Sequence, residues 1–243
     1  MRVKGIVSYD GSHYQGFQDQ KKDNINTIQG VIEKLLSYIC DEKIVIIGSG
    51  RTDKGVHALN QVFHFDMNNY RELNHLKYAL NRMLPQDILI ISLQEVNDDF
   101  HARYSATKKH YRYIIDLVRN PFNINYALYY DKKIDEEILS KGINLFLGEH
   151  EFKNFCSNKE KDSYIRTIYS FEYKKENNQL IFDIIGSGFK RYMVRMIIGT
   201  LLALNNHQID LSYIETRLND IKKGTTIYNA EPNGLYLVEV FYD

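Results

Sequence analysis

An acidic residue lies between two possible cationic partners in a glycine-rich segment, Gly48 to Ala58, which reads GSGRTDKGVHA. Asp53 is the acid, and Arg51 and His57 flank it. Apolar runs, IVII before the segment and VFHF after it, predict strands on both sides. Glycine loses the most backbone freedom on folding, so three glycines here indicate a tight turn or a close approach to a ligand. Taken alone, Asp53 is either a catalytic carboxylate or, the interpretation that this segment by itself favours, an acid that stabilises the loop through an Asx-turn or N-cap.

A second charged residue, Arg195, interrupts a helix predicted over 189–204 whose other residues are mostly apolar. A buried guanidinium requires a carboxylate, and a carboxylate such as Asp53 in a dry pocket requires a cation, for which Arg51 and Arg195 are the candidates. Burial raises a carboxyl pKa by as much as about 3 to 5 units. A cation roughly 4 Å away stabilises the ionised carboxylate by about 4 kcal/mol, which offsets a rise of close to three pKa units. Alternatively, Arg191, Arg195 and Gly199 form the polar stripe of the helix, and periodicity alone favours neither interpretation.

The charge of the whole chain is balanced, with 31 basic and 31 acidic residues. This balance argues against a protein that binds nucleic acid through a global basic field, so any RNA contact has to come from local clusters. Nineteen tyrosines and twelve phenylalanines supply flat faces on which bases could stack. Each cluster taken alone is more simply a solvated face. The clusters are Lys108, Lys109, His110 and Arg112; Lys190, Arg191 and Arg195; and Arg2 with Lys4.

The residues themselves do not favour a metal site. Cys40 and Cys156 lie far apart without a CxxC spacing, which argues against a disulfide framework or a zinc knuckle. Asp53, His57 and His101 resemble part of a metal-ligand set, but no third ligand of matching pattern accompanies the D-x3-H spacing. No apolar stretch approaches about 18 residues, so we expect a cytoplasmic protein.

Hydrophobic periodicity predicts an α+β fold in which one series of elements occurs twice. The order strand, helix, strand, strand, helix, strand is that of a split βαβ unit. We therefore expect two tandem ferredoxin-like (RRM-like) halves, 1–104 and 105–243, with antiparallel sheets and a central RNA-binding cleft. The first half has strands over 3–9, 43–48, 61–66 and 88–93 and helices over 27–39 and 73–83. The second has strands over 109–118, 165–174, 180–185 and 236–241 and helices over 135–147, 189–204 and 211–221.

Five motifs resemble those of the tRNA pseudouridine synthases of the TruA type, and they occur along this chain in the same order as in that family. GRTD followed by GVHA is similar to the central motif of that family. Two departures stand out, because Lys54 occupies a position where the family usually has Ala and Phe17 one where Trp is usual. They leave open a paralogue with an altered choice of target uridine. The other four motifs are YDGSHYQGFQ near the start, FHARYSATKKHYRY from Phe100, GSGFKRYMVRMIIGTLL from Gly186 and GLYLVEVFY near the end.

The resemblance implies a cofactor-independent enzyme that isomerises uridine to pseudouridine at positions 38 to 40 of the tRNA anticodon arm, and a homodimer. It implies that Asp53 is the catalytic carboxylate and pairs with Arg195. Arg51 would contact the RNA or help displace the target base, with a plain surface arginine as the alternative. Tyr111 would contact the base, the alternative being a core tyrosine on the face that it shares with Tyr113, which we interpret as structural. Phosphate contacts are expected from Lys108, Lys109, Lys190 and Arg191.

Two rival functions follow from the same residues. The first is a non-catalytic RNA-binding protein built on RRM-like units, which would keep its tRNA affinity and its cellular effect after Asp53→Asn. The second is a metal-dependent hydrolase built on Asp53, His57 and His101, which chelators would inactivate. For the two histidines, structural or RNA-contacting roles are the favoured interpretation.

Overall fold

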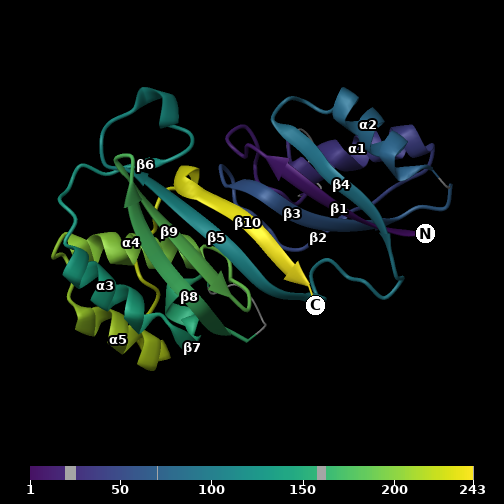
Figure 1. Cartoon of the computed structure of the whole chain (residues 1–243). Helices are drawn as coiled ribbons and strands as arrows, with labels where there is room; N and C mark the ends of the chain where they lie inside the picture. Colours follow the sequence, from purple (N-terminus) through teal and green to yellow (C-terminus); the bar gives the residue numbers. More distant parts are fainter. Residues whose placement is uncertain (20–25, 70, 158–162, 243) are drawn as a thin grey trace. The chain divides into compact units, whose positions relative to one another are not determined.

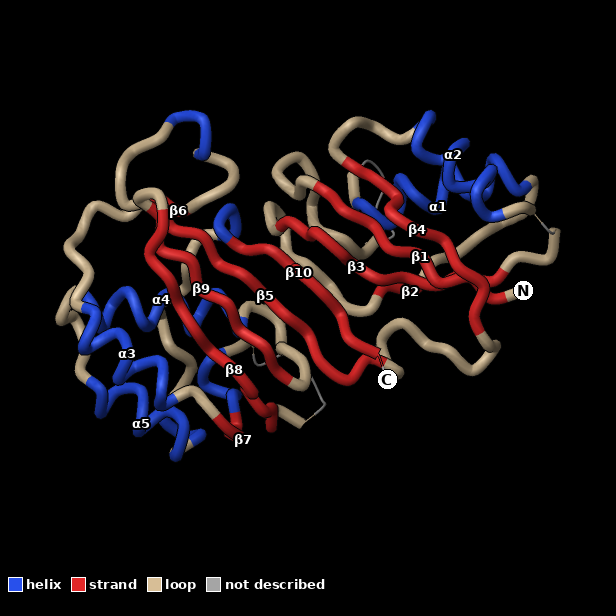
Figure 2. Tube along the Cα trace, viewed as in Figure 1, coloured by secondary structure: helices blue, strands red, loops and turns tan. Residues whose placement is uncertain are grey.

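The computed structural model describes residues 1–19, 26–69, 71–157 and 163–242 (Figure 1). Its contacts divide the chain into two compact units. The first unit contains Met1–Thr107 together with Tyr236–Asp243, and the second contains Lys108–Leu235. The last strand therefore belongs to the unit that the N-terminal residues build. The fold is mixed, with α-helices and β-strands in both units (Figure 2).

The first unit has a sheet in the order β4-β1-β3-β10, with the short β2 paired to β3. Strand β1 runs antiparallel to both β3 and β4, whereas β10 runs parallel to β3 and pairs Tyr236 with His57. Buried and half-buried residues alternate along β1, as a strand with one face on the core requires. The strands are β1 (Arg2–Tyr9), β2 (Ile47–Gly48), β3 (His57–Asp66), β4 (Ile88–Val96) and β10 (Leu235–Tyr242).

Two helices, α1 (Ile28–Cys40) and α2 (Leu73–Met83), pack against each other in this unit. Helix α1 begins where the Thr27 side chain accepts a hydrogen bond from the Gly30 amide, and it ends at Asp41, whose φ of 54° is left-handed. Its buried residues recur every four positions, at Ile28, Ile32, Leu36 and Cys40, and form the face that packs on the core.

The strand predicted over 43–48 is wrong in extent, because only Ile47–Gly48 pair as a strand. The amide of Ile44 donates instead to the Ser37 hydroxyl at 2.8 Å, and the amide of Ile46 to a Glu33 carboxylate oxygen at 2.8 Å. Side chains of α1 thus take the hydrogen bonds that a neighbouring strand would have taken.

The second unit has a sheet in the order β5-β9-β8-β7, in which these neighbours are antiparallel, and β6 pairs parallel to β5. The strands are β5 (Ala106–Asp116), β6 (Leu128–Tyr129), β7 (Gly148–Glu151), β8 (Ile165–Glu176) and β9 (Gln179–Gly186). The helices are α3 (Glu136–Leu145), α4 (Met193–Asn205) and α5 (Leu211–Asn219), with short 3-10 turns at Pro121–Asn123, Phe152–Phe155, Ile221–Lys223 and Pro232–Gly234.

Helix α4 supplies much of the core of the second unit, but it begins four residues later than the predicted start at 189. The backbone of Gly188 has φ 148° and that of Tyr192 has φ 66°, and neither value is compatible with an α-helix. The residues before Met193 therefore form a loop.

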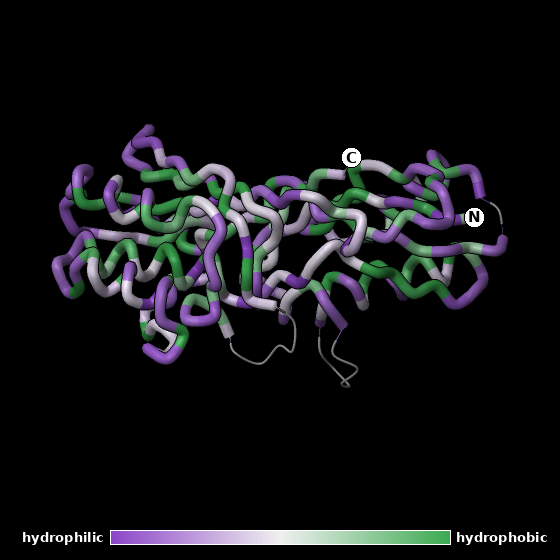
Figure 3. Tube along the Cα trace, turned by 90° about the horizontal axis from the view of Figure 1, so that it is seen from below, coloured by the Kyte–Doolittle hydropathy of each residue, from purple (hydrophilic) through white to green (hydrophobic). Residues whose placement is uncertain are grey.

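Figure 3 shows hydrophobic and hydrophilic residues following each other closely along the chain. Of the helices that the structure describes, none combines the length and the apolar character that a membrane span requires.

Candidate active site

The loop between β2 and β3 carries Asp53 in the first unit. Asp53 is half-buried, whereas Arg51 is exposed and Thr52 is only 6% exposed. The Val56 amide donates to the Asp53 carbonyl at 3.1 Å and closes a tight turn, in which Gly55 adopts φ 78°. One of the three glycines thus serves the turn that the sequence predicted, directly after the acid.

The N-terminal loop that follows β1 packs against this turn backbone to backbone. A Cβ on Gly11 would lie 2.0 Å from the Val56 carbonyl oxygen, and one on Gly16 would lie 2.6 Å from the Thr52 carbonyl oxygen. The Phe17 amide donates to that same Thr52 oxygen at 3.2 Å. The glycines of YDGSHYQGFQ are therefore required where this loop crosses the Asp53 loop, which explains why the two motifs act as one structural feature.

A hydroxyl pair joins β1 to the same loop. Tyr9, the last residue of β1, is 4% exposed, and its hydroxyl lies 2.7 Å from the hydroxyl of Thr52. Sequence reasoning did not identify either residue, because no local pattern shows that two hydroxyls separated by 43 residues will meet.

His57 is buried at the start of β3 and has a structural environment. Its Nδ1 accepts a hydrogen bond from the Gly11 amide at 3.2 Å and lies 3.1 Å from an Asp10 carboxylate oxygen. Its ring stacks on Tyr236 with centroids 4.7 Å apart. His101 uses its own Nδ1 to accept from the amides of Arg103 and Tyr104. Within the described ranges, no three His, Cys, Asp or Glu side chains are grouped so that they could hold a metal ion.

Arg195 lies on α4 in the second unit and is half-buried. Its Nε donates to the Ala230 carbonyl at 2.7 Å, and its guanidinium lies over the Tyr192 ring, 5.3 Å from the centroid. Gly199, one turn further, packs so closely on the chain at 228–230 that a Cβ would lie 2.7 Å from the Asn229 nitrogen. The segment 228–230 therefore covers the side of α4 that carries Arg195 and Gly199. A polar stripe on this side was one of the two interpretations of the sequence.

Tyr111 and Tyr113 share the core-facing side of β5. Tyr113 is fully buried and donates a hydrogen bond to the Glu231 carbonyl at 2.6 Å, as expected for a structural residue. Tyr111 is 8% exposed and meets the edge of Phe189, with ring centroids 5.2 Å apart. Its predicted contact with a base stays a prediction.

Three of the four residues predicted to contact phosphate lie against tyrosine rings of the second unit. Lys108 lies over Tyr169, with its ammonium 5.4 Å from the centroid. The other two contacts are Lys190 over Tyr164 at 5.3 Å and Arg191 over Tyr192 at 4.7 Å. Lys190 is only 6% exposed, whereas Lys108 and Arg191 are exposed and Lys109 is half-buried. Flat rings thus accompany these cations, an arrangement that also occurs in surfaces that bind single-stranded nucleic acid.

The predicted residues fall into two groups. Arg51 and Asp53 belong to the first unit, and Tyr111, Arg195 and the basic residues belong to the second. The pairing of Asp53 with Arg195 stays a prediction.

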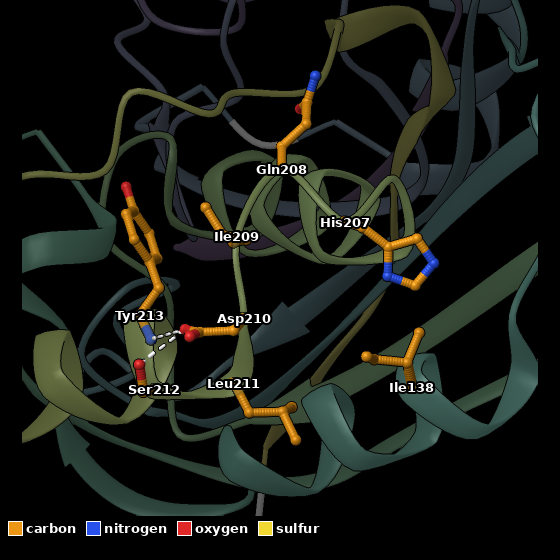
Figure 4. Close-up of a pocket in the computed structure, with 8 residues that line it drawn as sticks. All are labelled: Ile138, His207, Gln208, Ile209, Asp210, Leu211, Ser212 and Tyr213. Atoms are coloured by element: carbon orange, nitrogen blue, oxygen red, sulfur yellow. Dashed lines mark hydrogen bonds between the residues drawn. The ribbon is translucent and has the colours of Figure 1, made fainter.

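A hollow of about 800 Å³ lies between α3 and the chain that joins α4 to α5 (Figure 4). Its one acid, Asp210, accepts hydrogen bonds from the Ser212 hydroxyl at 2.7 Å and from the Tyr213 amide at 3.0 Å. The carboxylate therefore caps the N-terminus of α5. None of the predicted site residues lines this hollow, which consists of Ile138, His207, Gln208, Ile209, Asp210, Leu211, Ser212 and Tyr213.

Comparisons with known proteins give one consistent result. The sequence model of a family described as tRNA pseudouridine synthase matches residues 6–105 and 143–243. A tRNA pseudouridine synthase A of Mycoplasma genitalium is 42% identical over 244 residues, which cover 100% of this chain and 99% of that protein. Proteins of the same name from Streptococcus uberis and an Exiguobacterium species are 40% and 39% identical, each covering 100% of this chain and 98% of the relative. A solved structure described as a Cbf5-Nop10-Gar1 complex has 12% identity, covers 96% of this chain and 57% of that chain, and has a TM-score of 0.38, at which the likeness carries no argument.

Proposed function

We infer that this protein isomerises uridine to pseudouridine in tRNA, because the chain belongs to the tRNA pseudouridine synthase family. The observation that carries the inference is the match of relatives along the whole chain at about 40% identity. The reaction is an isomerisation, so uridine and pseudouridine contain the same atoms and no oxidant or reductant is consumed. The enzyme has to break the bond between N1 and C1′, turn the uracil and join C5 to C1′. The proton on C5 then leaves and N1 takes up a proton, so the atoms balance.

Asp53 is the group that we assign to this chemistry. A carboxylate either attacks C1′ to form a covalent intermediate or removes the C2′ proton to give a glycal, and both routes require it to be ionised. Its half-buried position at the tip of a tightly held turn supports the assignment. Arg195 is the proposed counter-charge, and the hydrogen bond from its Nε to Ala230 supports this role by fixing the direction of the guanidinium.

A uracil stacked in an RNA stem cannot react, so the target nucleotide has to leave the stack. We assign Arg51, which is exposed beside Asp53, to displacing the base or contacting the RNA. Tyr111 would then lie against the uracil, and Lys108, Lys109, Lys190 and Arg191 would contact phosphates. The proposed target is the anticodon arm at positions 38 to 40, in cytoplasmic tRNA, and the proposed assembly is a homodimer.

Two tandem ferredoxin-like halves, 1–104 and 105–243, remain the proposed architecture. In this proposal the last strand completes the element order of the second half, whereas its contacts group it with the first unit. The antiparallel neighbours in each unit and the helices beside them support it. The central RNA-binding cleft belongs to the same proposal.

The decisive experiment uses purified protein and tRNA that carries tritium at C5 of its uridines. We expect release of tritium in the presence of EDTA, with the modified positions mapped in the product. Asp53→Ala should abolish the release while tRNA binding, measured by filter retention, stays within about threefold of the wild type. Asp41→Asn, which removes an exposed acid of the same unit, is the matched control and should be fully active. Tritium release that EDTA abolishes would overturn the cofactor-independent reaction, and full activity of Asp53→Ala would overturn the assignment of Asp53.

A further inference from the structure

The residue before the proposed catalytic acid is held at both of its polar ends. The Thr52 hydroxyl forms a hydrogen bond with the Tyr9 hydroxyl at 2.7 Å, in a buried environment. The Thr52 carbonyl accepts a hydrogen bond from the Phe17 amide at 3.2 Å. Because Thr52 is bonded directly to Asp53, any shift of its backbone moves the carboxylate as well.

Tyr9 is well placed to act as a fixed point. It lies where β1 ends, paired with Ala58 on one side and Ile88 on the other, and it is 4% exposed. The register between β1 and β3 shifts between Val7 and Tyr9, an irregularity of the β-bulge kind. Bulges of this kind change the direction of a side chain next to a functional site. The irregularity lies directly before Tyr9 in β1, next to the residue whose hydroxyl reaches Thr52.

The hydroxyl of Tyr9, unlike its ring, is not needed to fill the core. The ring packs near Phe17, with centroids 6.1 Å apart, and a phenylalanine would make the same apolar contact. The hydroxyl adds a directional contact to the Asp53 loop. In a buried site, losing one partner of such a bond leaves the other without its hydrogen bond and allows the loop to move.

We propose that Tyr9 is a positioning residue that holds Asp53 in its reactive orientation through the Thr52 hydroxyl, an inference that rests on the proposed role of Asp53. A displacement of about 1 Å in a reacting group costs on the order of a hundredfold in rate. Both residues of the contact are buried, so we expect it to affect the chemical step rather than the affinity for tRNA.

The test compares single-turnover rates and tRNA affinities of Tyr9→Phe, Thr52→Val and the double variant. We expect each single variant to lose about tenfold or more in rate, with tRNA affinity within about threefold of the wild type. The double variant should lose no more than the singles, because all three lack the same hydrogen bond. Thr52→Ser keeps a hydroxyl and should restore most of the rate.

Tyr130→Phe is the matched control. The Tyr130 hydroxyl also donates a short hydrogen bond, to the Asn206 side chain at 2.6 Å, but it lies in the second unit among helical residues. This variant should lose stability without losing rate. Rates within about twofold of the wild type for both Tyr9→Phe and Thr52→Val would overturn the proposal, as would a multiplicative loss in the double variant. If Asp53→Ala itself stays active, the assignment of Asp53 fails first, so the two failures are distinguishable.

Discussion

His64 should make the first unit less stable in mild acid. It lies on β3 and is 2% exposed, and its Nδ1 accepts a hydrogen bond from the Ala102 amide at 3.1 Å. Burial, and after it the nearby charges of His101 and Arg2, lower the pKa of His64 to about 4. The folded protein therefore keeps this imidazole neutral at a pH where an unfolded chain would protonate it.

The size and sign of the effect follow from the two pKa values. The unfolded imidazole titrates near 6.5 and the folded one near 4, a gap that corresponds to about 3 kcal/mol at 1.36 kcal/mol per unit. Between these values the unfolded state binds more protons, so stability falls as the pH falls. The stabilisation that the neutral imidazole contributes is fully present above the pKa of the unfolded state. It is lost by the time the pH falls to the pKa of the folded state.

The assay measures the free energy of unfolding by urea at several values between about pH 7 and pH 4. Because the chain has two units, unfolding should be followed through amide signals of β1 and β3. His64→Gln cannot titrate, so the pH dependence of the wild type should exceed that of the variant by about 3 kcal/mol. His75→Gln, which changes a side chain that is 90% exposed, is the control for loss of one imidazole. An NMR titration of His64 in the folded protein with a midpoint above about 6 would refute the reasoning.

Substitutions at three further positions test contacts within the two units, each by urea unfolding against the wild type. Gly199→Ala should destabilise the protein by about 1 to 3 kcal/mol, although alanine favours helices, because the Cβ would meet the backbone at 228–230; an increase in stability would contradict this contact. Thr27→Ala should cost about 1 kcal/mol through loss of the α1 cap, while Thr27→Ser should retain most of it. Tyr113→Phe should cost about 1 kcal/mol, because the Glu231 carbonyl loses its donor, and an unchanged unfolding midpoint would exclude that hydrogen bond.

Local patterns predicted the helices of the first unit well. The apolar spacing from Ile28 gave a helix over 27–39, and α1 spans Ile28–Cys40. The second helix ends at Met83, before Pro85, as predicted. Both elements bury a face at helical spacing and carry their own end signals, so the information lies within the segment itself.

Elements that depend on distant partners were predicted less well. The isoleucines at 44 and 46 have the composition of a strand, but their amides bind side chains of α1. The start of α4 depends on the left-handed backbone at Tyr192, a residue type that gives no such warning. The pairing of β10 with β3 joins residues about 180 positions apart, which no local pattern encodes.

The candidate site divides in the same way. The glycines around Asp53 correctly indicated a tight turn, since Gly55 has φ 78°. For the tyrosine rings beneath Lys108 and Arg191, the sequence showed only that the chain is rich in aromatic residues. Which ring lies under which cation depends on the fold. Tyr9 and Thr52 were missed because each is unremarkable alone and gains its role only from the contact between them.

The parallel pairing of β10 with β3 has a consequence for how the protein is made. The Asp53 loop leads into β3 at His57, whose ring stacks on Tyr236 of the last strand. A ribosome has to add residues 108–235 before that strand exists, which at roughly 5 to 20 residues per second takes on the order of 10 s. During this interval the end of β3 beside the loop lacks that neighbour and is open to wrong partners. The strand that begins directly after the Asp53 loop therefore gains this neighbour only when β10 has been translated.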